Sequence, residues 1–468
     1  MSRVGKLKML NHKSTAAANK SMISSEFKNK WTFRLSKKSE KRSVKKSTYI
    51  RVFFLNFAIS VIRIYLIVYL PVYLLNILKV DRSQLAFMQV FIYLVMFSGP
   101  ILGYLFDRYS KNKKLIMISS SILFLASFLL SVLNVNNLSI FGLFLALNLL
   151  SQEIVKVGIS KLIIDLSKNE AVKDNNLVTI NISSNVGSFI PSVVFLFTVS
   201  DIFNMDLWNG FFFIGFLSSL PIILCTVFLR EITNEPKKNL EHCERDIKSF
   251  AGNNTLNLIL LFLSCLLIWS DKLYQFPFSS WILTRFGEEA FNIYSLLYIV
   301  LILLNIGGCI IGQRISNKEN NRINNVISEN RNNMDFKGDN QENMYSIKLS
   351  NQIRIISITV GLYAILTFMM AISDFFFLMI IQWIIQVISG VMMLNYASLM
   401  ITISNNGKHK TFTYQCLKIS FALSSVIFIP LGTYFSAFIQ IEMLFITVGF
   451  LSLLSIIPLS LMRVKSNN

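Results

Sequence analysis

Apolar and polar residues alternate along this chain in long blocks rather than in the short periods of a soluble helix or strand. After a polar start, twelve apolar runs are separated by short polar breaks. A helix of about 20 apolar residues is long enough to cross a bilayer, so each run predicts one membrane span. The predicted spans are Ile50–Leu78, Gln84–Phe106, Leu115–Leu133, Leu138–Ser160, Leu177–Ser200, Leu207–Leu229, Leu256–Thr284, Phe291–Gly312, Ile355–Ile372, Phe375–Ile403, Thr411–Phe435 and Met443–Leu461.

The polar segment 230–255 divides these runs into six and six. We therefore predict an all-α membrane protein with 12 transmembrane helices in two six-helix halves. A second polar segment is rich in Asn and too hydrophilic to pack, so we expect a disordered loop there. The predicted organisation is a disordered basic tail (1–48), a first bundle (49–229), a central loop (230–255), a second bundle (256–462) with the Asn-rich insert (313–348), and a short tail (463–468).

Composition and charge agree with a membrane protein. Hydrophobic residues make up 53% of the chain and charged residues only 15%, which is too apolar for a soluble enzyme of this size. The formal net charge is +20. Most basic residues fall on the side of the amino-terminal tail, and the opposite loops hold only Lys79, Arg82 and Arg285. Since basic residues favour the cytoplasmic side, we expect both termini in the cytoplasm, in the plasma membrane or an organelle membrane.

This topology accounts for the basic charge without a nucleic-acid partner. The first 47 residues have no apolar core of a secretory signal, although their basic, acid-poor composition also resembles an organelle transit sequence. The five cysteines lack disulfide or metal-ligand spacing, so we predict no metal and no cofactor.

A charged motif follows the second span, in the sequence Gly103-Tyr-Leu-Phe-Asp107-Arg108-Tyr-Ser-Lys111. It resembles the G-x-L-x-D-R-x-G-R-K signature of the major facilitator superfamily, at the same loop. The resemblance implies a conformational latch made by Gly103, Asp107, Arg108 and Lys111. Gly103 would let a neighbouring helix approach closely. Asp107 would accept hydrogen bonds from a helix end in the same half and pair with a basic residue.

The second half carries only a degenerate copy of this motif, Gly308-Cys-Ile-Ile-Gly312-Gln-Arg314, which lacks the aspartate. Any latch there must be built differently. Within the superfamily, Pro100-x-x-Gly103-x-x-x-Asp107 and Thr402-Ile-Ser-Asn-Asn-Gly407 are similar to motifs of the folate-biopterin transporter group. Departures from that group at Lys156 and Ser160 leave its pteridine or folate substrate open.

Ionisable side chains inside spans are costly and usually face a cavity, which makes them the best indicators of a binding site. Five of the six deep charges lie on spans one, four and seven. By resemblance to the superfamily, the first helix of each three-helix repeat lines the central cavity. The six are Arg63, Glu153, Lys156, Asp271, Lys272 and Lys418. Glu153 and Lys156 are three residues apart and can pair on one helix face.

The tenth span has no charge, but Gln382, Gln386 and Asn395 place amides close to one helical face. We assign these amides to solute binding together with Arg63, Glu153, Lys156, Asp271 and Lys272. Five aromatic residues could add flat walls for a ring system, although lipid or helix packing is the more common reason for such residues: Tyr65, Tyr69, Tyr274, Trp281 and Trp383. Six residues are candidate bending points for alternating access: Pro71, Pro191, Pro277, Pro430, Gly187 and Gly390.

Four bases against two acids in this set favour a small anionic solute. The sequence therefore predicts a monomeric transporter that moves an organic anion by facilitated diffusion or with protons, Arg63 binding the anionic group and Asp271 or Glu153 carrying the proton. An embedded enzyme is disfavoured because His12, His242 and His409 all lie in polar tails or loops. A channel or a receptor is the third alternative. Besides the solute and protons, the partner is the lipid bilayer.

Overall fold

The computed structural model describes residues 50–109, 112–166, 170–198, 204–229, 256, 259–331, 340–404 and 410–462. The contacts divide the chain into Met1–Val52 and Phe53–Asn468, and the second unit holds the helical bundle. The predicted basic tail, the central loop 230–255, Lys111 and the segment Asn405–Gly407 lie outside the described residues.

Eleven segments of the described chain are long and apolar enough to cross a membrane. One of them, Ile259–Lys318, is two helices, because the backbone at Gly287 leaves the helical region with φ 85° and ψ −179°. A positive φ is readily adopted only by glycine, which explains the break. With this segment counted as two, the predicted twelve spans and the all-α fold class are confirmed.

Several spans are built from more than one helical piece, where η denotes π- or 3₁₀-helical turns. The first half contains η1 (Tyr65–Tyr69), α2 (Leu70–Val72), η2 (Tyr73–Ile77), α3 (Arg82–Leu94), η3 (Val95–Ser98), α4 (Gly99–Arg108), α5 (Lys113–Leu133), α6 (Leu138–Leu166), α7 (Glu170–Thr198), α8 (Met205–Ser219) and α9 (Pro221–Val227). The second half contains η5 (Trp269–Asp271), α11 (Lys272–Arg331), α12 (Asn340–Met370), α13 (Phe375–Ser404), α14 (Lys410–Phe435), α15 (Ile441–Leu454) and α16 (Ile456–Leu461).

The polar breaks between spans also start the next helix. The side chain of Asp81 accepts a hydrogen bond from the Gln84 amide at 3.1 Å, and Asp374 accepts one from the Phe377 amide at 2.9 Å. Asn204 caps α8 in the same way. Each cap satisfies a backbone N–H that has no partner within the helix, so these short polar residues fix where a span begins.

The candidate bending points are used in two ways. Pro71 lies in α2 between the π-helical turns η1 and η2, where wider turns accommodate a residue that has no N–H. Gly187 and Gly390 serve close packing, since a Cβ at Gly187 would collide with the Phe57 carbonyl and one at Gly390 with the Asn305 carbonyl. These two glycines therefore set helix separation within each half.

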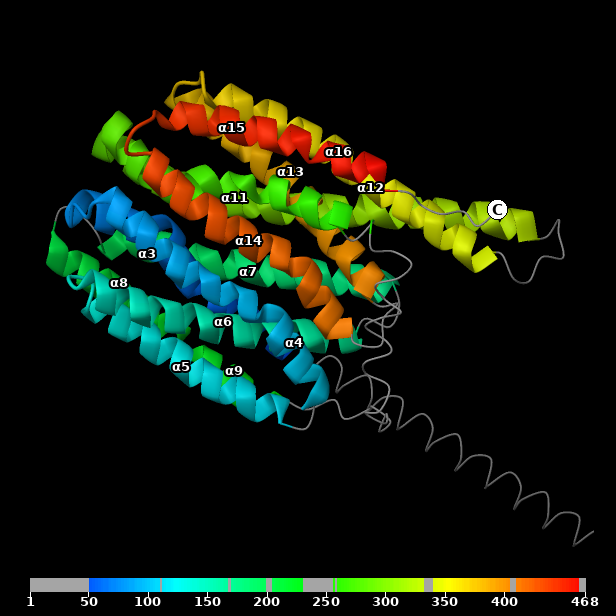
Figure 1. Cartoon of the computed structure of the whole chain (residues 1–468), viewed down its shortest axis with the longest axis horizontal. Coiled ribbons are helices and arrows are strands. Elements are labelled where there is room, and N and C mark those ends of the chain that lie inside the picture. Colours follow the sequence, from blue (N-terminus) through cyan, green and yellow to red (C-terminus); the bar gives the residue numbers. More distant parts are fainter. Residues whose placement is uncertain are drawn as a thin grey trace, which may run out of the picture. The chain divides into compact units, whose positions relative to one another are not determined.

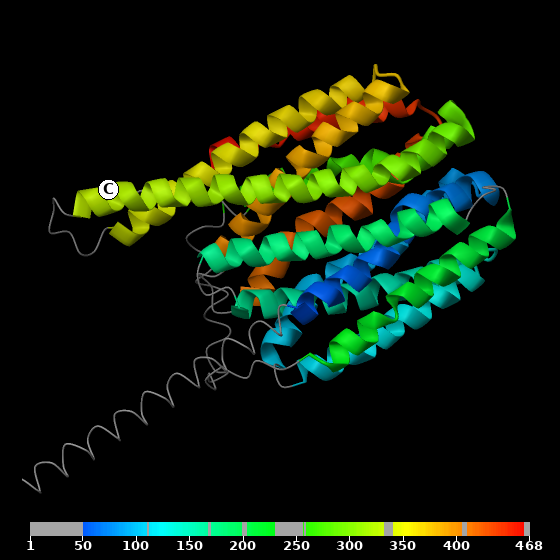
Figure 2. The same cartoon turned by 180° about the vertical axis from the view of Figure 1, so that it is seen from behind.

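The halves meet along two pairs of helices. α14 of the second half packs along α3 and α4, and α7 of the first half packs along α11 (Figure 1). The view from behind shows α7 beside α11 again (Figure 2). We call the end of the bundle with the 109–112 turn the inner end, which the charge distribution predicts to be cytoplasmic, and the opposite end the outer end.

The Asn-rich insert differs from its prediction. Helix α11 continues to Arg331 and α12 begins at Asn340, so most of residues 313–348 are helical rather than a disordered loop. Figure 1 shows these ends of α11 and α12 extending beyond the other helices. A span that has already formed removes the nucleation cost of a helix, and the Lys, Glu and Arg residues that follow favour its propagation.

Candidate functional site

Arg63 lies in the first span and faces the interface between the two halves. Its charge interacts with Tyr93 of the second span and with Asp271 and Tyr298 of the second half. It also repels Lys156 of the fourth span. A side chain with neighbours on four other helices lies inside the bundle, not against lipid. Among the described residues, none makes a hydrogen bond or ion pair with Arg63, although its side chain is only half-buried.

Asp271 and Lys272 point to different places, as expected for adjacent residues. Asp271 ends η5, is half-buried, and accepts a hydrogen bond from the Gln275 amide at 2.8 Å. Lys272 is 5% exposed and turns toward α14. Its Nζ donates to the Phe421 carbonyl at 2.7 Å, to Ser424 Oγ at 2.8 Å and to Ser425 Oγ at 2.6 Å.

These three bonds use every donor of the Lys272 ammonium. The ammonium also lies 3.3 Å from the Phe421 ring centroid, a cation–π contact. In this structure Lys272 ties α11 to α14 within the second half, and its solute-binding role stays a prediction. Sequence pattern could not reveal this, since the partners lie about 150 residues further along the chain.

The predicted ion pair between Glu153 and Lys156 does not form. Lys156 Nζ instead donates to Gln152 Oε1 at 3.2 Å, and Gln152 bonds to Asn148 at 2.9 Å, one turn further back on α6. Glu153 is 9% exposed, and its Oε1 lies 3.4 Å from the Cβ position of Gly99 on α4. The two charges attract each other at a distance, while their side chains leave the helix in different directions.

The span-ten amides do not share one environment. Gln386 accepts a hydrogen bond from Asn305 of α11 at 3.3 Å and is half-buried. Gln382 is 5% exposed and contacts the Met370 sulfur at 3.3 Å. Asn395 is fully buried and donates to the Val391 carbonyl of its own helix at 2.7 Å. Only Gln386 of this predicted set is joined to the contact between the halves.

The motif after the second span makes a three-part contact at the inner end. Asp107 Oδ1 lies 3.0 Å from Lys161 Nζ of α6, and Oδ2 accepts a hydrogen bond from the Phe412 backbone N–H at 3.1 Å. Phe412 lies in the first turn of α14, whose free N–H groups attract a carboxylate. A Cβ at Gly103 would lie 3.1 Å from Gln415 Cγ, so α4 and α14 approach closely.

The pairing of Asp107 with a basic residue and the close approach at Gly103 match the expectation. The helix end differs, because it belongs to the second half and not to the same half. Arg108 is exposed and its guanidinium lies 5.5 Å from the ring centroid of the adjacent Tyr109. It takes no part in the contact that Asp107 makes.

Comparison with protein families matches residues 12–190 and 52–328 to the Major Facilitator Superfamily. These residues are well over half of the chain. The chain belongs to the major facilitator superfamily. The predicted folate-biopterin group stays a prediction, since nothing in the comparisons separates groups within the superfamily.

Solved structures of this superfamily's fold agree with the assignment. The nucleoside transporter NupG is similar with a TM-score of 0.57, 12% identity, and coverage of 89% of this chain and 98% of that one. A mutant form of NupG reaches a TM-score of 0.60 at 13% identity, covering 89% and 99%. The human organic anion transporter MFSD10 (TETRAN) has a TM-score of 0.59 and 12% identity, covering 88% and 99%. At these identities the likeness shows the fold alone. A comparison with curated proteins finds no match.

Membership in the superfamily makes this chain a multi-pass membrane transporter.

The aromatic candidates of this transporter mostly pack within one half. Tyr69 stacks on Phe195 with ring centroids 4.6 Å apart, and Tyr65 lies 4.5 Å from Phe211. Tyr274 and Trp281 both contact Phe445 in the second half. Tyr65, Tyr274 and Trp281 pack in the cores of their halves, whereas Tyr69 also lies near Ser295 and Tyr298 of the second half.

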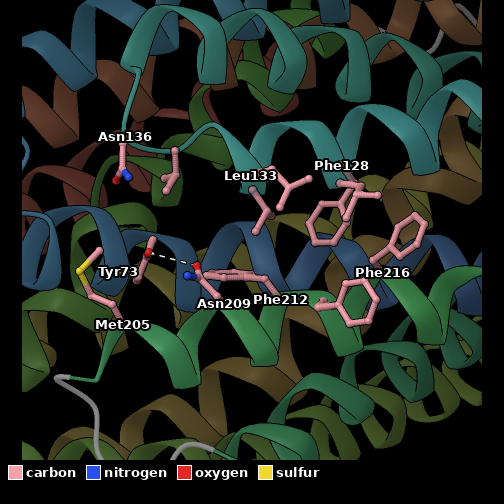
Figure 3. A pocket seen from close by; sticks show the side chains of 12 residues that line it. Tyr73, Phe128, Leu133, Asn136, Met205, Asn209, Phe212 and Phe216 are labelled. Atoms are coloured by element: carbon pink, nitrogen blue, oxygen red, sulfur yellow. Dashed lines mark hydrogen bonds between the residues drawn. The ribbon is translucent and has the colours of Figure 1, made fainter.

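A cavity of about 180 Å³ lies within the first half at the outer end, away from Arg63. Figure 3 shows its wall of Phe128, Phe212 and Phe216, with Asn209 beside Tyr73. The Tyr73 hydroxyl donates to Asn209 at 3.4 Å. The predicted site residues do not line it, so it is separate from the charges at the interface.

Sequence reasoning missed Lys161, which pairs with Asp107 inside the first half. It also missed four residues of this transporter that join helices across the interface: Asn181, Asn185, Asn305 and Cys309. The available signal was an amide inside an apolar run, which is costly in a membrane unless it is paired. Asparagine is frequent in this chain, and that frequency hid the signal.

Proposed function

We propose that this transporter carries a small organic anion by alternating access, with Arg63 binding the anionic group. Arg63 is the observation that carries the proposal. Of the other deep cations, Lys272 bonds to α14, Lys156 bonds to Gln152, and Lys418 lies 5.4 Å from the ring centroid of Tyr414, whereas none of the described residues bonds to Arg63. Leaving a guanidinium unpaired at this depth is costly, and an anionic solute would remove that cost.

The position of Arg63 suits a solute site shared by both halves. The first half contributes Arg63 and Lys156, and the second half contributes Asp271, with Gln386 farther along span ten. The solute would then contact both bundles. A carrier needs this if solute binding is to change the arrangement of the two halves. Of the two activities named for the structural neighbours, nucleoside and organic anion transport, the unpaired guanidinium favours the anion.

Contacts near both ends of the interface support alternating access. At the inner end Asp107 accepts the Phe412 N–H bond. At the outer end Ser280 Oγ donates to Asn76 Oδ1 at 2.5 Å, and Arg82 donates to the Ser436 carbonyl. A carrier must break one set while it keeps the other, so these contacts are the ones that would open in turn.

The solute is tested by uptake into vesicles that contain the purified protein. We expect saturable uptake and counterflow with members of a carboxylate and phosphate panel, and not with their neutral esters or amides. In Arg63→Ala the anion uptake at low concentration should fall about 10- to 100-fold, the value of a charge-assisted hydrogen bond. Arg354→Ala is the matched control, because Arg354 is exposed at a span end and should not affect uptake.

Anion uptake that is unchanged in Arg63→Ala, or equal uptake of the neutral analogues, would overturn the assignment. Flux that neither saturates nor shows counterflow would indicate a channel instead of a carrier. Absence of flux with every candidate would favour a receptor.

Coupling to protons belongs to the same proposal, and Asp271 is its carrier. Asp271 is close enough to Arg63 for their charges to attract each other, and its hydrogen-bond partner is the uncharged Gln275 amide. A proton on Asp271 would remove the negative charge that attracts Arg63 and leave the guanidinium to the solute. Asp271→Asn should therefore keep solute exchange while it abolishes accumulation driven by a proton gradient. Unchanged accumulation in that variant would transfer the role to Glu153.

A further inference from the structure

The degenerate motif of the second half leaves that half without a counterpart of Asp107. When Gly308 is aligned with Gly103, Gly312 stands where the aspartate would be. The equivalent pair of helices, α7 and α11, nevertheless packs together. Something other than a carboxylate must therefore hold this contact.

Amides and a thiol meet on the inner half of the α7–α11 contact. Asn185 Nδ2 donates to Asn305 Oδ1 at 2.8 Å, and Asn181 Nδ2 donates to Cys309 Sγ. Asn181 and Asn185 are four residues apart on α7, and Asn305 and Cys309 are four residues apart on α11. One turn of α7 therefore faces one turn of α11. On the outer half of the same contact the partners are rings, Phe195 and Phe291, with centroids 5.8 Å apart.

Other residues of the second half hold Asn305 and Cys309 in place. Asn305 Nδ2 donates to the Gln386 side chain at 3.3 Å and to its carbonyl at 3.2 Å, and Cys309 Sγ donates to the Gly390 carbonyl at 3.3 Å. A Cβ at Gly308 would collide with the Val387 carbonyl, so α11 and α13 touch through their backbones. Asn305 and Cys309 thus present fixed acceptors to α7.

We propose that Asn181, Asn185, Asn305 and Cys309 form an uncharged latch, which holds the inner halves of α7 and α11 together and breaks each time the inner end opens. The proposal goes beyond the transport function above and holds whether or not Arg63 binds an anion. An amide that parts from its partner exposes no charge, so the latch can break at a depth where an ion pair would be prohibitive.

The first test measures the inner end directly. Spin labels at Leu115 on α5 and Ser350 on α12, both exposed, report the distance between the halves in lipid nanodiscs. One interhelical hydrogen bond in a membrane changes an equilibrium by about threefold to tenfold. Asn185→Leu and Asn305→Leu should each raise the ratio of inner-open to inner-closed molecules by that factor. The double variant should add little to either single variant, because both remove the same bond.

Asn148→Leu is the matched control for this experiment. Asn148 is another asparagine within a span, more deeply buried than Asn185 and Asn305, but its amide donates to the Phe124 carbonyl at 2.8 Å inside the first half. The proposal is wrong if the distance distributions of Asn185→Leu and Asn305→Leu equal that of the parent protein. It is also wrong if Asn148→Leu shifts them equally.

A second measurement tests the latch if the leucine variants fold poorly. The Cys309 thiol is fully buried and forms part of the latch, whereas the half-buried Cys225 lies on α9 of the first half. Alkylation by a maleimide, read by mass spectrometry, should become about threefold to tenfold faster at Cys309 in Asn181→Ser and stay unchanged at Cys225. Faster labelling of both cysteines would indicate unfolding and would contradict the latch, as would no change at either.

Discussion

The two contacts that join the halves on their inner side are built from opposite chemistry. Where α4 meets α14, the carboxylate of Asp107 bonds at once to Lys161 of its own half and to the first turn of α14. Where α7 meets α11, amides and a thiol do the joining. The charged contact lies at the end of its span beside the 109–112 turn, and the uncharged one lies deeper.

This difference follows from the cost of burying charge. An ion pair near the end of a span can regain water when it opens, whereas one deeper in the hydrocarbon region cannot. An amide pair is weaker but loses less when it parts. In the proposal above, the two contacts serve one mechanical task with two chemistries, each suited to its depth in the membrane.

The largest effect is expected at the charged contact. Asp107→Ala removes both bonds of the carboxylate and leaves Lys161, which is 9% exposed, without that partner. Loss of one member of a buried pair costs about 3–5 kcal/mol. We expect most molecules to become inner-open in the spin-label assay, with a lower melting temperature. Asp107→Ala combined with Lys161→Met should recover the melting temperature but not the closed inner end.

Recovery of the closed end in that double variant would show that the ion pair, and not the bond to α14, closes the bundle. The charged contact would then act only inside the first half. The charged contact and the contact between α7 and α11 would then no longer share the task of closing the inner end.

A smaller effect is expected from the helix separation at the same contact. In Gly103→Ala the new Cβ would lie 3.1 Å from Gln415 Cγ and 3.2 Å from the Thr411 carbonyl, which is tighter than ordinary packing. The helices must shift by a few tenths of an ångström, and we expect a several-fold rise in inner-open molecules. Gly210→Ala is the control, because nothing lies within 4 Å of its Cβ position. Equal behaviour of the two variants in the spin-label assay would contradict close approach as the reason for this glycine.

The smallest effect is expected when the uncharged contact keeps its acceptor. Cys309→Ser preserves a side chain that can accept from Asn181 and donate to Gly390, so the inner-open ratio should change less than about twofold. Cys309→Ala removes both bonds and should change it about threefold to tenfold. If both substitutions leave the ratio unchanged, the Asn181–Cys309 bond contributes nothing and the latch reduces to Asn185 and Asn305.

Much of the fold could be predicted because a span needs little more than length and apolarity. The predicted ends agree with the helices to within a few residues, from the first span at Ile50–Ile77 to the last at Ile441–Leu461. The prediction of a disordered loop in the insert was wrong because composition describes how a segment behaves when nothing adjoins it. Residues 313–331 continue a helix that the eighth span has already formed.

The site was predicted less well, for a physical reason. A charge inside a span indicates that a partner must exist, but not which one. Arg63 and Lys272 are both basic residues in spans expected to line the cavity. Lys272 bonds to three groups of α14, whereas none of the described residues bonds to Arg63.

By itself, the amino-acid sequence determined the number of spans, their expected orientation and the position of the charged motif, because each depends on local hydrophobicity and charge. The tertiary structure alone decided which half Asp107 bonds to, that Lys272 is a structural tie, and that Asn185 meets Asn305. Those outcomes depend on pairs of residues more than 100 positions apart. Such pairs meet only when the helices pack, and no local pattern encodes which of the many polar residues in spans will face one another.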